Sequence, residues 1–194
     1  GTLQPLKTPS AQQSGLKLRT PFLVGADVTT EILVDFDACN SVVPTGASGG
    51  FLLKPVVRLA DKLGGAIQGY VSTTLTLPDT TVSPQVNGEV IRSTIPDSSG
   101  RFKLAYLPRG DYTVVITSRN RATAVVTGVP VGSSTVAMNA SAAPILPPAS
   151  TTHTVSGEVT SGASEVGDAM VAARQVISGG EPIQVHSTPV DFEL

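Results

Sequence analysis

The sequence predicts an all-β protein, organised as a series of small β-sandwich modules. Val, Thr, Ala, Ser, Gly and Pro dominate the composition, whereas aromatic residues make up 4% and Trp is absent. β-Branched residues favour strands, and Gly and Pro favour the tight turns between them. Alternating apolar segments recur roughly every 8 to 15 residues with turn signals between them, and none carries a convincing helical period.

Residues 1–63 are expected to contribute part of a first sandwich. The clearest alternation lies in EILVDFDACNSVV, where Ile32, Val34, Phe36 and Ala38 share one face. We expect that face to be buried and the opposite, mostly acidic face to be wet. The strands expected in this region are 16–24, 31–43 and 51–60.

Residues 64–140 are expected to form one complete sandwich. The turn PRGD places Pro early and Gly late, as a tight β-turn requires, and PDSSG is a second turn. Phe102 and Leu104 share one face of a strand, as do Tyr112 and Val114 on the next, so we expect all four in the core. The strands expected here are 65–75, 85–95, 101–107, 112–118, 121–131 and 134–140.

Beyond this module the chain is rich in proline and then begins to repeat itself. Residues 141–152, SAAPILPPASTT, contain three prolines and are expected to form an extended, semi-rigid linker. HTVSGEVTSG, which begins at His153, restates GAIQGYVSTT from the middle module, so residues 153–194 are expected to form a partial further sandwich. Further strands are expected at 167–177 and 184–194, with a helix over 165–176 as the alternative to the first.

The middle module carries a specific pattern in GAIQGYV and DSSGRFKLAYLPRGDYTVVIT. The positions that make up the pattern are Gly100, Phe102, Leu107, Pro108, Gly110 and Tyr112. With these residues, 65–140 resembles the carboxypeptidase-regulatory-like, transthyretin-like family. The resemblance implies tandem immunoglobulin-like or transthyretin-like β-sandwich modules in this chain.

A second pattern lies in SAQQSGLKLRTPF, LVDFDACNSVV and FLLKPVVRL. With it, residues 9–60 resemble the C-terminal half of an uncharacterised domain of exported bacterial lipoproteins. The resemblance implies an extracellular or cell-surface location, with the periplasm as the alternative, and no known activity. Only half of that domain is present, and the last module stops before an L-P-x-G-x-Y equivalent. We therefore expect either a processed fragment or a chain whose missing strands come from another chain.

Charge and hydropathy exclude several classes of function. The formal net charge is −2 and charged residues make up 14%, which excludes the basic surface of a nucleic-acid-binding protein. No run of about 18 apolar residues encodes a membrane span. Any export signal is expected upstream of the polar first residues. The single cysteine, Cys39, has no internal partner for a disulfide, so we interpret it as an inert thiol or an intermolecular bridge.

Three acidic residues form the only candidate metal site. Asp35 and Asp37 share a strand face with Glu31, and their carboxylates would lie about 6 to 7 Å apart. That spacing suits calcium if loop carbonyls complete the shell. It also fits a solvated acidic face paired with Lys54 or Arg58, or a pair of catalytic acids. No Asp-x-Asp-x-Asp-Gly loop favours the metal, and no other cofactor is expected.

No convincing catalytic motif is present, so we do not expect an enzyme. His153 and His186 have no cysteine or carboxylate at ligand spacing, no G-x-S-x-G turn exists, and GASGG (46–50) lacks the lysine and helix of a phosphate loop. Tyr70 and Tyr106 alternate outward and are candidates for a small aromatic platform that binds a glycan.

These observations favour a non-catalytic extracellular structural or adhesive protein. Unpaired strand edges at incomplete end domains are templates for strands of other chains, so we expect self-association, up to a filament, or binding of another surface protein. The alternative is an accessory module that binds a glycan or a protein partner within a larger exported protein.

Overall fold

The computed structural model of the chain describes residues 4–8, 32–36, 41–45, 50–53, 57–61, 64–160 and 170–190. The chain divides into two compact units. The first is made of Gly1–Lys62, Ser161–Val171 and Thr188–Leu194, and the second of Leu63–Thr160 and Ala172–Ser187. Apart from one short 3-10 helix, every element whose bounds the structure gives is a strand, so the all-β prediction is confirmed.

The first unit contains two small sheets. One has the order β1-β4-β3 and the other pairs β2 with β5 in antiparallel register. The bounds are β1 Leu6–Lys7, β2 Ile32–Phe36, β3 Val42–Thr45, β4 Gly50–Leu53 and β5 Val57–Asp61. The segments 31–43 and 51–60, each expected to be one strand, therefore hold two strands apiece, and 16–24 lies outside the described residues.

The expected core face of β2 is not buried. Val34 and Phe36 are 52% and 44% exposed. In the part of the chain that the structure describes, β2 pairs only with β5, and a two-stranded ribbon has too little surface to bury a face by itself. The alternation correctly identified a strand, but not a buried side.

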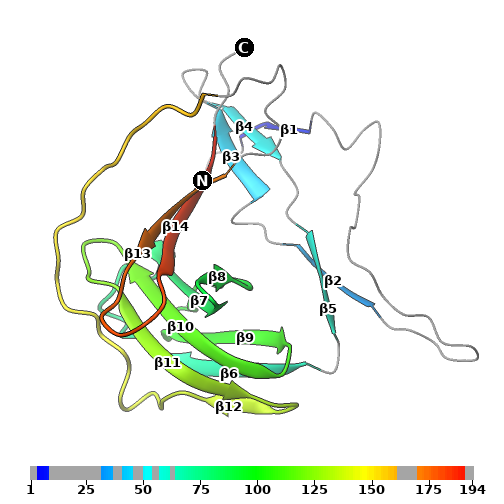
Figure 1. Cartoon of the computed structure of the whole chain (residues 1–194), viewed down its shortest axis with the longest axis vertical. Helices are drawn as coiled ribbons and strands as arrows, with labels where there is room; N and C mark the ends of the chain where they lie inside the picture. The colour runs from blue at the N-terminus through cyan, green and yellow to red at the C-terminus, as the bar shows by residue number, and fades with distance from the viewer. Residues whose placement is uncertain are drawn as a thin grey trace, which may run out of the picture. The chain divides into compact units, whose positions relative to one another are not determined.

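The second unit is built on a β-sandwich. Figure 1 shows its two sheets, which have the orders β11-β10-β7-β8 and β12-β6-β9. The bounds are β6 Gly65–Tyr70, β7 Thr80–Val86, β8 Glu89–Val90, β9 Arg101–Leu107, β10 Gly110–Ser118, β11 Ala124–Val131 and β12 Thr135–Ala137, with the 3-10 helix η1 at Leu77–Asp79. The core between the sheets holds Ile67, Val71, Leu75, Val82, Phe102, Leu104, Leu107, Tyr112, Val114, Ile116, Val129 and Val131.

The pattern residues of the middle module have clear structural roles. Gly100 has φ +76°, and a Cβ there would lie 2.1 Å from the carbonyl oxygen of Val71, so only glycine fits. Phe102 is 2% exposed. The Tyr112 hydroxyl donates a hydrogen bond of 2.8 Å to the carbonyl of Pro108, which fastens the β9–β10 turn to the core. Burial raises the pKa of Tyr112, and a nearby arginine opposes that shift in part.

The turn before Gly100 is organised by Asp97. Its carboxylate accepts hydrogen bonds from the Ser99 hydroxyl at 2.6 Å, the Ser99 amide at 2.9 Å and the Arg101 amide at 3.1 Å. The bond from the Ser99 side chain is the main cause of a lowered pKa of Asp97. The PDSSG segment is therefore a turn, as the sequence predicts, and it is stabilised by the ionised carboxylate.

The segment 85–95 is not one strand. β7 begins at Thr80, earlier than expected, and ends at Val86, after which Asn87 and Gly88 form a two-residue hairpin turn with φ +53° and +73°. Positive φ at both positions is the requirement of a type I′ turn, for which Asn-Gly is the preferred pair. The chain reverses there into β8, and Val86 pairs with Glu89.

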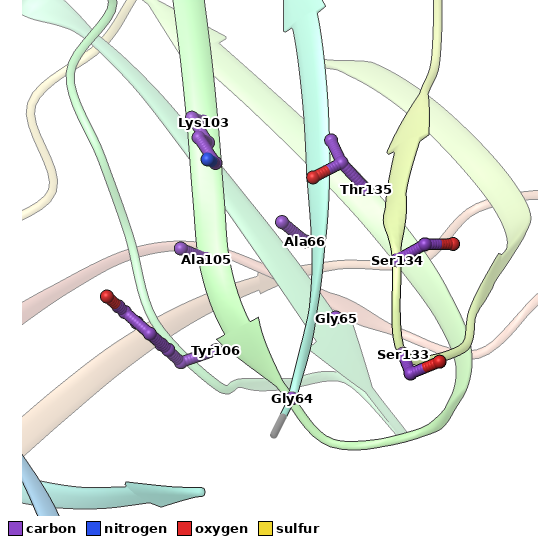
Figure 2. A pocket seen from close by; sticks show the side chains of 9 residues that line it. All are labelled: Gly64, Gly65, Ala66, Lys103, Ala105, Tyr106, Ser133, Ser134 and Thr135. Atoms are coloured by element: carbon purple, nitrogen blue, oxygen red, sulfur yellow. The ribbon is translucent and has the colours of Figure 1, made fainter. Parts of the chain in front are cut away.

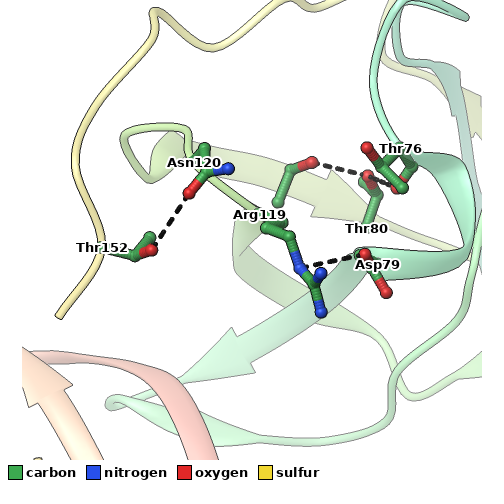
Figure 3. A network of polar contacts seen from close by, with 7 residues as sticks. Thr76, Asp79, Thr80, Arg119, Asn120 and Thr152 are labelled. Carbon is green, nitrogen blue, oxygen red and sulfur yellow. Dashed lines mark hydrogen bonds and ion pairs between the residues drawn. The ribbon is translucent and has the colours of Figure 1, made fainter. Parts of the chain in front are cut away.

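The proline-rich segment 141–152 is attached to the sandwich. Ile145 bridges to Val71 in parallel register, and the amide of Ala122 donates to the carbonyl of Pro148 at 2.9 Å. Figure 3 shows one end of this attachment, where the Thr152 hydroxyl bonds to the Asn120 side chain at 3.2 Å. The segment therefore lies along the module instead of standing off as a spacer.

Figure 3 also shows how the loop after β10 is held to η1. Thr80 donates its hydroxyl to the carbonyl of Thr76 at 3.0 Å, so the 2.8 Å bond between Thr80 and Ser118 has the Ser118 hydroxyl as donor. Arg119 and Asp79 add an ion pair of 3.1 Å between partly exposed groups. Several weak contacts thus fix the loop that carries the attachment of segment 141–152.

The C-terminal part of the described chain contains a hairpin and an exposed stretch. β13 (Met170–Gln175) pairs with β14 (Ile183–Pro189), so residues 170–175 form a strand and not the alternative helix. Residues 153–160 lie in no strand and are exposed, with Val155 at 95%. The repeat of β6 that begins at His153 therefore does not form the expected strand.

Candidate functional site

The outer face of the β11-β10-β7-β8 sheet carries three buried residues. Side chains alternate along a strand, so Val82 of β7 points into the core while Ser83 and Gln85 point to the opposite face. Val115 of β10 pairs with Ser83 and shares that outer face. Ser83, Gln85 and Val115 are only 7%, 1% and 1% exposed. These three residues do not face the core between the sheets, so another part of the chain must cover them.

The segment that covers Gln85 is β14, which lies 99 residues away in sequence. The Gln85 Nε2 donates to the carbonyl of Gln184 at 2.6 Å, and Gln85 Oε1 accepts from the Gln184 amide at 2.9 Å. Nε2 also donates to the Ser83 hydroxyl at 3.2 Å. The partners fix which atom is oxygen and which is nitrogen, because an amide N–H requires an acceptor and a carbonyl a donor.

This arrangement makes the Gln85 side chain a substitute for a strand residue. Its carboxamide exchanges two hydrogen bonds with both backbone groups of Gln184, as the paired residues of two adjacent strands do. A buried carboxamide without partners would cost about 1 to 3 kcal/mol, so a strand that covers Gln85 must also pair with its two polar atoms. We call Gln85, Gly88 and their contacts on β14 the Gln85 site.

Gly88 and Ile183 complete the Gln85 site. A Cβ at Gly88 would lie 2.1 Å from the carbonyl oxygen of Pro182, so the turn at Gly88 touches the backbone just before β14. Ile183 is 2% exposed although it lies outside the main core cluster. The site therefore has three components. They are the Gln85 carboxamide that binds backbone groups, the space at Gly88 that a side chain would fill (the Gly88 notch), and the buried side chain of Ile183.

A second carboxamide works in the same way within the sandwich. Asn139 Oδ1 accepts from the Tyr70 amide at 2.7 Å, and its Nδ2 donates to the Tyr70 carbonyl at 2.9 Å and to the Ala143 carbonyl at 2.8 Å. Asn139 thereby extends the pairing of β12 with β6 beyond the end of β12. It provides an internal reference for the Gln85 site.

The two tyrosines proposed as one glycan platform lie far apart. Tyr70 is opposite Arg101 in the β6–β9 pair, at the other end of the pair from Tyr106. Five residue steps lead from Arg101 to Tyr106, and at about 3.3 Å per step they separate the two tyrosines by about 16 Å. They cannot stack on the same sugar ring, so any contribution to glycan binding would be separate.

Tyr106 lies beside a shallow, mainly polar groove of about 240 Å³. Figure 2 shows Lys103, Ala105 and Tyr106 on one side of β6 and the Ser133–Thr135 segment on the other. Tyr106 is 40% exposed and has φ +57°, which turns it out of the strand pattern. The groove offers hydroxyl groups, one ammonium group and an aromatic ring.

The acidic candidates are only partly visible. The register of β2 and β5 places Asp35 directly opposite Arg58, one of the two cations named as its alternative partner. Glu31 and Asp37 lie outside the described residues, as does Cys39, so the calcium site stays a prediction. Among the described residues, no group of three or more His, Cys, Asp or Glu side chains is placed to hold a metal.

The other candidates show no assembled chemistry in the part of the chain that the structure describes. His153 and His186 are both exposed. Most of the glycine-rich segment 46–50 lies outside the described residues, and Gly50 begins β4. No helix among the described residues is long and apolar enough to span a membrane.

Comparison with known proteins gives a partial assignment. Residues 2–55 match the family described as a domain of unknown function (DUF4382). No curated protein matches the chain.

Two similar solved structures are mutants of a type II cohesin–X-dockerin complex from Acetivibrio cellulolyticus. The N-terminal interface mutant has 28% identity over 44% of this chain and 58% of that chain, with a TM-score of 0.37. The C-terminal interface mutant has 27% identity over 42% and 56%, with a TM-score of 0.34. The chain thus matches little more than half the length of either, and the all-β assignment rests on the strands themselves.

The sequence interpretation missed the Gln85 site. One signal was present, because Asn87-Gly88 between alternating segments is a strong indicator of a hairpin and would have ended β7 at the correct residue. The partner of Gln85 carries no such signal, since the contact involves only backbone atoms of Gln184.

Proposed function

We propose that the chain is a non-catalytic structural or adhesive protein of the cell surface whose sandwich binds β-strand segments of protein chains. One observation carries the proposal. The buried Gln85 carboxamide binds both backbone groups of a strand that is 99 residues away. A site that reads backbone atoms recognises an extended segment by its shape, which is the chemistry of strand addition.

The proposal includes association between copies of the chain through such strands, up to a surface assembly or filament. The two open sandwich sheets support it, because a further strand can add at the edge of a sheet. The extracellular or cell-surface location, the periplasm being the alternative, and the lipoprotein origin come from the sequence resemblances alone and belong to the same proposal.

Sedimentation velocity of the full 194-residue chain tests the association. The range from about 1 µM to about 1 mM reaches the effective concentration of a tethered segment, which is on the order of millimolar, so species larger than the monomer should appear towards its upper end. A sedimentation coefficient that stays at the monomer value over the whole range would rule the association out.

The second candidate is an accessory module that binds a glycan. The groove beside Tyr106 supports it, because an aromatic ring next to hydroxyl groups and Lys103 offers both stacking and hydrogen bonds. A glycan array should then show binding that Tyr106→Ala abolishes. Tyr70→Ala is the matched control and should leave binding unchanged, since Tyr70 lies at the far end of the strand pair. An array without any retained glycan excludes this candidate.

A further inference from the structure

The hairpin that fills the Gln85 site comes after residues 150–160 in the chain. The last hydrogen bonds between these residues and the sandwich are those of Ser150 and Thr152 to Asn120, among the contacts that the structure gives. Residues 153–160 then lie exposed and in no strand. Within residues 153–160, which the structure describes, no hydrogen bond ties the chain to the sandwich, whereas Gln184 of β14 is bound by Gln85.

The contacts of the Gln85 site do not distinguish a strand of the same copy from a strand of another copy. It contacts the amide and the carbonyl of Gln184, and it accommodates the carbonyl of Pro182 at Gly88. The same groups exist in every copy of the chain. An identical element that can leave its own site can therefore make the same contacts in a second copy, which is the basis of domain swapping.

We infer that the Gln85 site of one copy binds the Ile183–Gln184 segment of a second copy, with residues 153–160 as the connection that opens. This inference rests on the proposed self-association and names the surface and the strand that produce it. The occupant is the copy's own β14, because that segment is already seated with both backbone groups paired and with Ile183 buried.

The protein concentration determines which of two forms predominates. In the closed form β14 fills the Gln85 site of its own copy, and in the exchanged form it fills the site of another copy. A tethered segment competes at an effective concentration on the order of millimolar, so the closed monomer predominates in dilute solution. Exchange becomes favourable where copies are crowded. Closed and exchanged forms contain the same contacts, so a difference in the number of molecules per particle is the proper measurement.

Two complementary variants of the full chain test the inference. Gln85→Leu keeps the strand but removes the carboxamide, so that copy can only donate. Gln184→Pro keeps Gln85 but removes the amide that donates to it, so that copy can only accept. The Gln184 amide donates to Gln85 and not to β13. Proline at this position should therefore leave the hydrogen bonds between β13 and β14 intact.

Neither variant alone can form both hydrogen bonds of the contact, whereas an equimolar mixture can. In the mixture, the internal strand that competes for the intact site carries proline at position 184 and can accept only the bond from Gln85 Nε2. We expect the dimer fraction of the mixture, measured by sedimentation velocity or by energy transfer between labelled copies, to exceed that of either variant alone at least about tenfold. Gln184→Ala is the matched control and should behave as wild type, because the Gln184 side chain makes neither of the two bonds.

The outcomes separate the two proposals. If the wild type associates and each variant alone associates equally well, self-association stands and the Gln85 site is not its cause. If the wild type stays monomeric at all concentrations, the proposed self-association fails as well. If Gln85→Leu loses its folded circular dichroism spectrum, Gly88→Ala replaces it, since a methyl group there blocks Pro182 while Gln85 stays in place. A mixture with Gly88→Ala that forms no more dimer than the single variants overturns the inference.

Discussion

Replacing Gly88 by alanine should release the docked hairpin while the sandwich stays folded. Gly88 has φ +73°, and the added methyl group would lie 2.1 Å from the Pro182 carbonyl oxygen. To reach ordinary contact, Pro182 must move by more than an ångström. The two bonds between Gln85 and Gln184, now 2.6 and 2.9 Å, would then exceed hydrogen-bonding distance.

The expected magnitude follows from those two bonds. At about 1 kcal/mol each, their loss lowers the free energy of opening the hairpin by about 2 kcal/mol, which raises the opening constant about 30-fold. Hydrogen exchange of the Gln184 amide, followed by NMR, measures that constant directly, because this amide donates to Gln85.

Gly128→Ala is the control for the backbone conformation. Gly128 has φ +68°, so alanine there carries a similar left-handed strain of about 1 to 2 kcal/mol. Nothing lies within 4 Å of a Cβ at Gly128, so no contact is displaced. Exchange of the Gln184 amide should therefore stay at the wild-type rate in Gly128→Ala. Equal acceleration in both variants would show that Gly88 acts through backbone strain alone and would refute the reasoning.

Three further predictions concern the sandwich itself. Tyr112→Phe loses the bond to Pro108 and about 1 kcal/mol of stability at pH 7. Because the pKa of Tyr112 is raised from 10.0, its contribution is present below pH 10 and falls as the pH rises through the folded value, so urea titrations should show a shallower alkaline loss in the variant than in wild type. Asp97 has a pKa lowered from 3.8, so its contribution is present above pH 3.8 and is lost as the pH falls through the folded value; Asp97→Asn should reduce the acid-side slope, and an unchanged slope would contradict this. Gly100→Ala should cost about 3 kcal/mol in thermal or urea unfolding, from left-handed strain and the displaced Val71 carbonyl, and a loss below about 1 kcal/mol would show that the loop yields easily.

The parts of the fold that the sequence predicts well are those determined by local contacts. Residues 101–107 and 112–118 lie within β9 and β10, because alternation and the turn between them identify a hairpin without any distant information. The bounds of β7 were predicted wrongly, because residues 85–95 were expected to form one strand whereas β7 is Thr80–Val86. β7 includes Pro84, although proline is uncommon inside an internal strand. The structure accommodates Pro84, whose carbonyl still accepts from the Ile91 amide.

The attachment of the proline-rich segment was not predicted. Its three prolines were expected to make residues 141–152 an extended, semi-rigid linker, and proline lacks an amide hydrogen to donate. Its carbonyl groups are unaffected, however. Pro147 and Pro148 accept hydrogen bonds from the side chain of Arg121 and the amide of Ala122. The attachment depends on donors from the β10–β11 loop, which the segment's own composition does not reveal.

The Gln85 site was beyond sequence reasoning because its partner is defined by backbone geometry. Alternation places Gln85 on the outer face of its sheet, where a polar residue is ordinarily exposed. Its burial at 1% exposure becomes visible only once β14 is placed over it. Residue types at 85 and 184 contain no information on a contact that uses one side chain and one stretch of main chain.

Asn139 and Gln85 show how one chemical device serves two purposes. A carboxamide offers an acceptor and a donor at the spacing of a peptide group, so it can pair with both backbone groups of a strand residue. Asn139 does so for Tyr70 immediately after β12, where the pairing of β12 with β6 already brings the partner into place although 69 residues separate the two. Gln85 does so for Gln184, which is 99 residues away on β14, a strand that pairs with β13 and with no strand of the sandwich sheets. The Asn139 contact therefore stabilises a strand pair that is already formed, whereas the Gln85 contact can bind any extended strand that reaches the site. Selection at the Gln85 site then depends on the Gly88 notch and on the buried Ile183, because the carboxamide itself accepts any extended main chain.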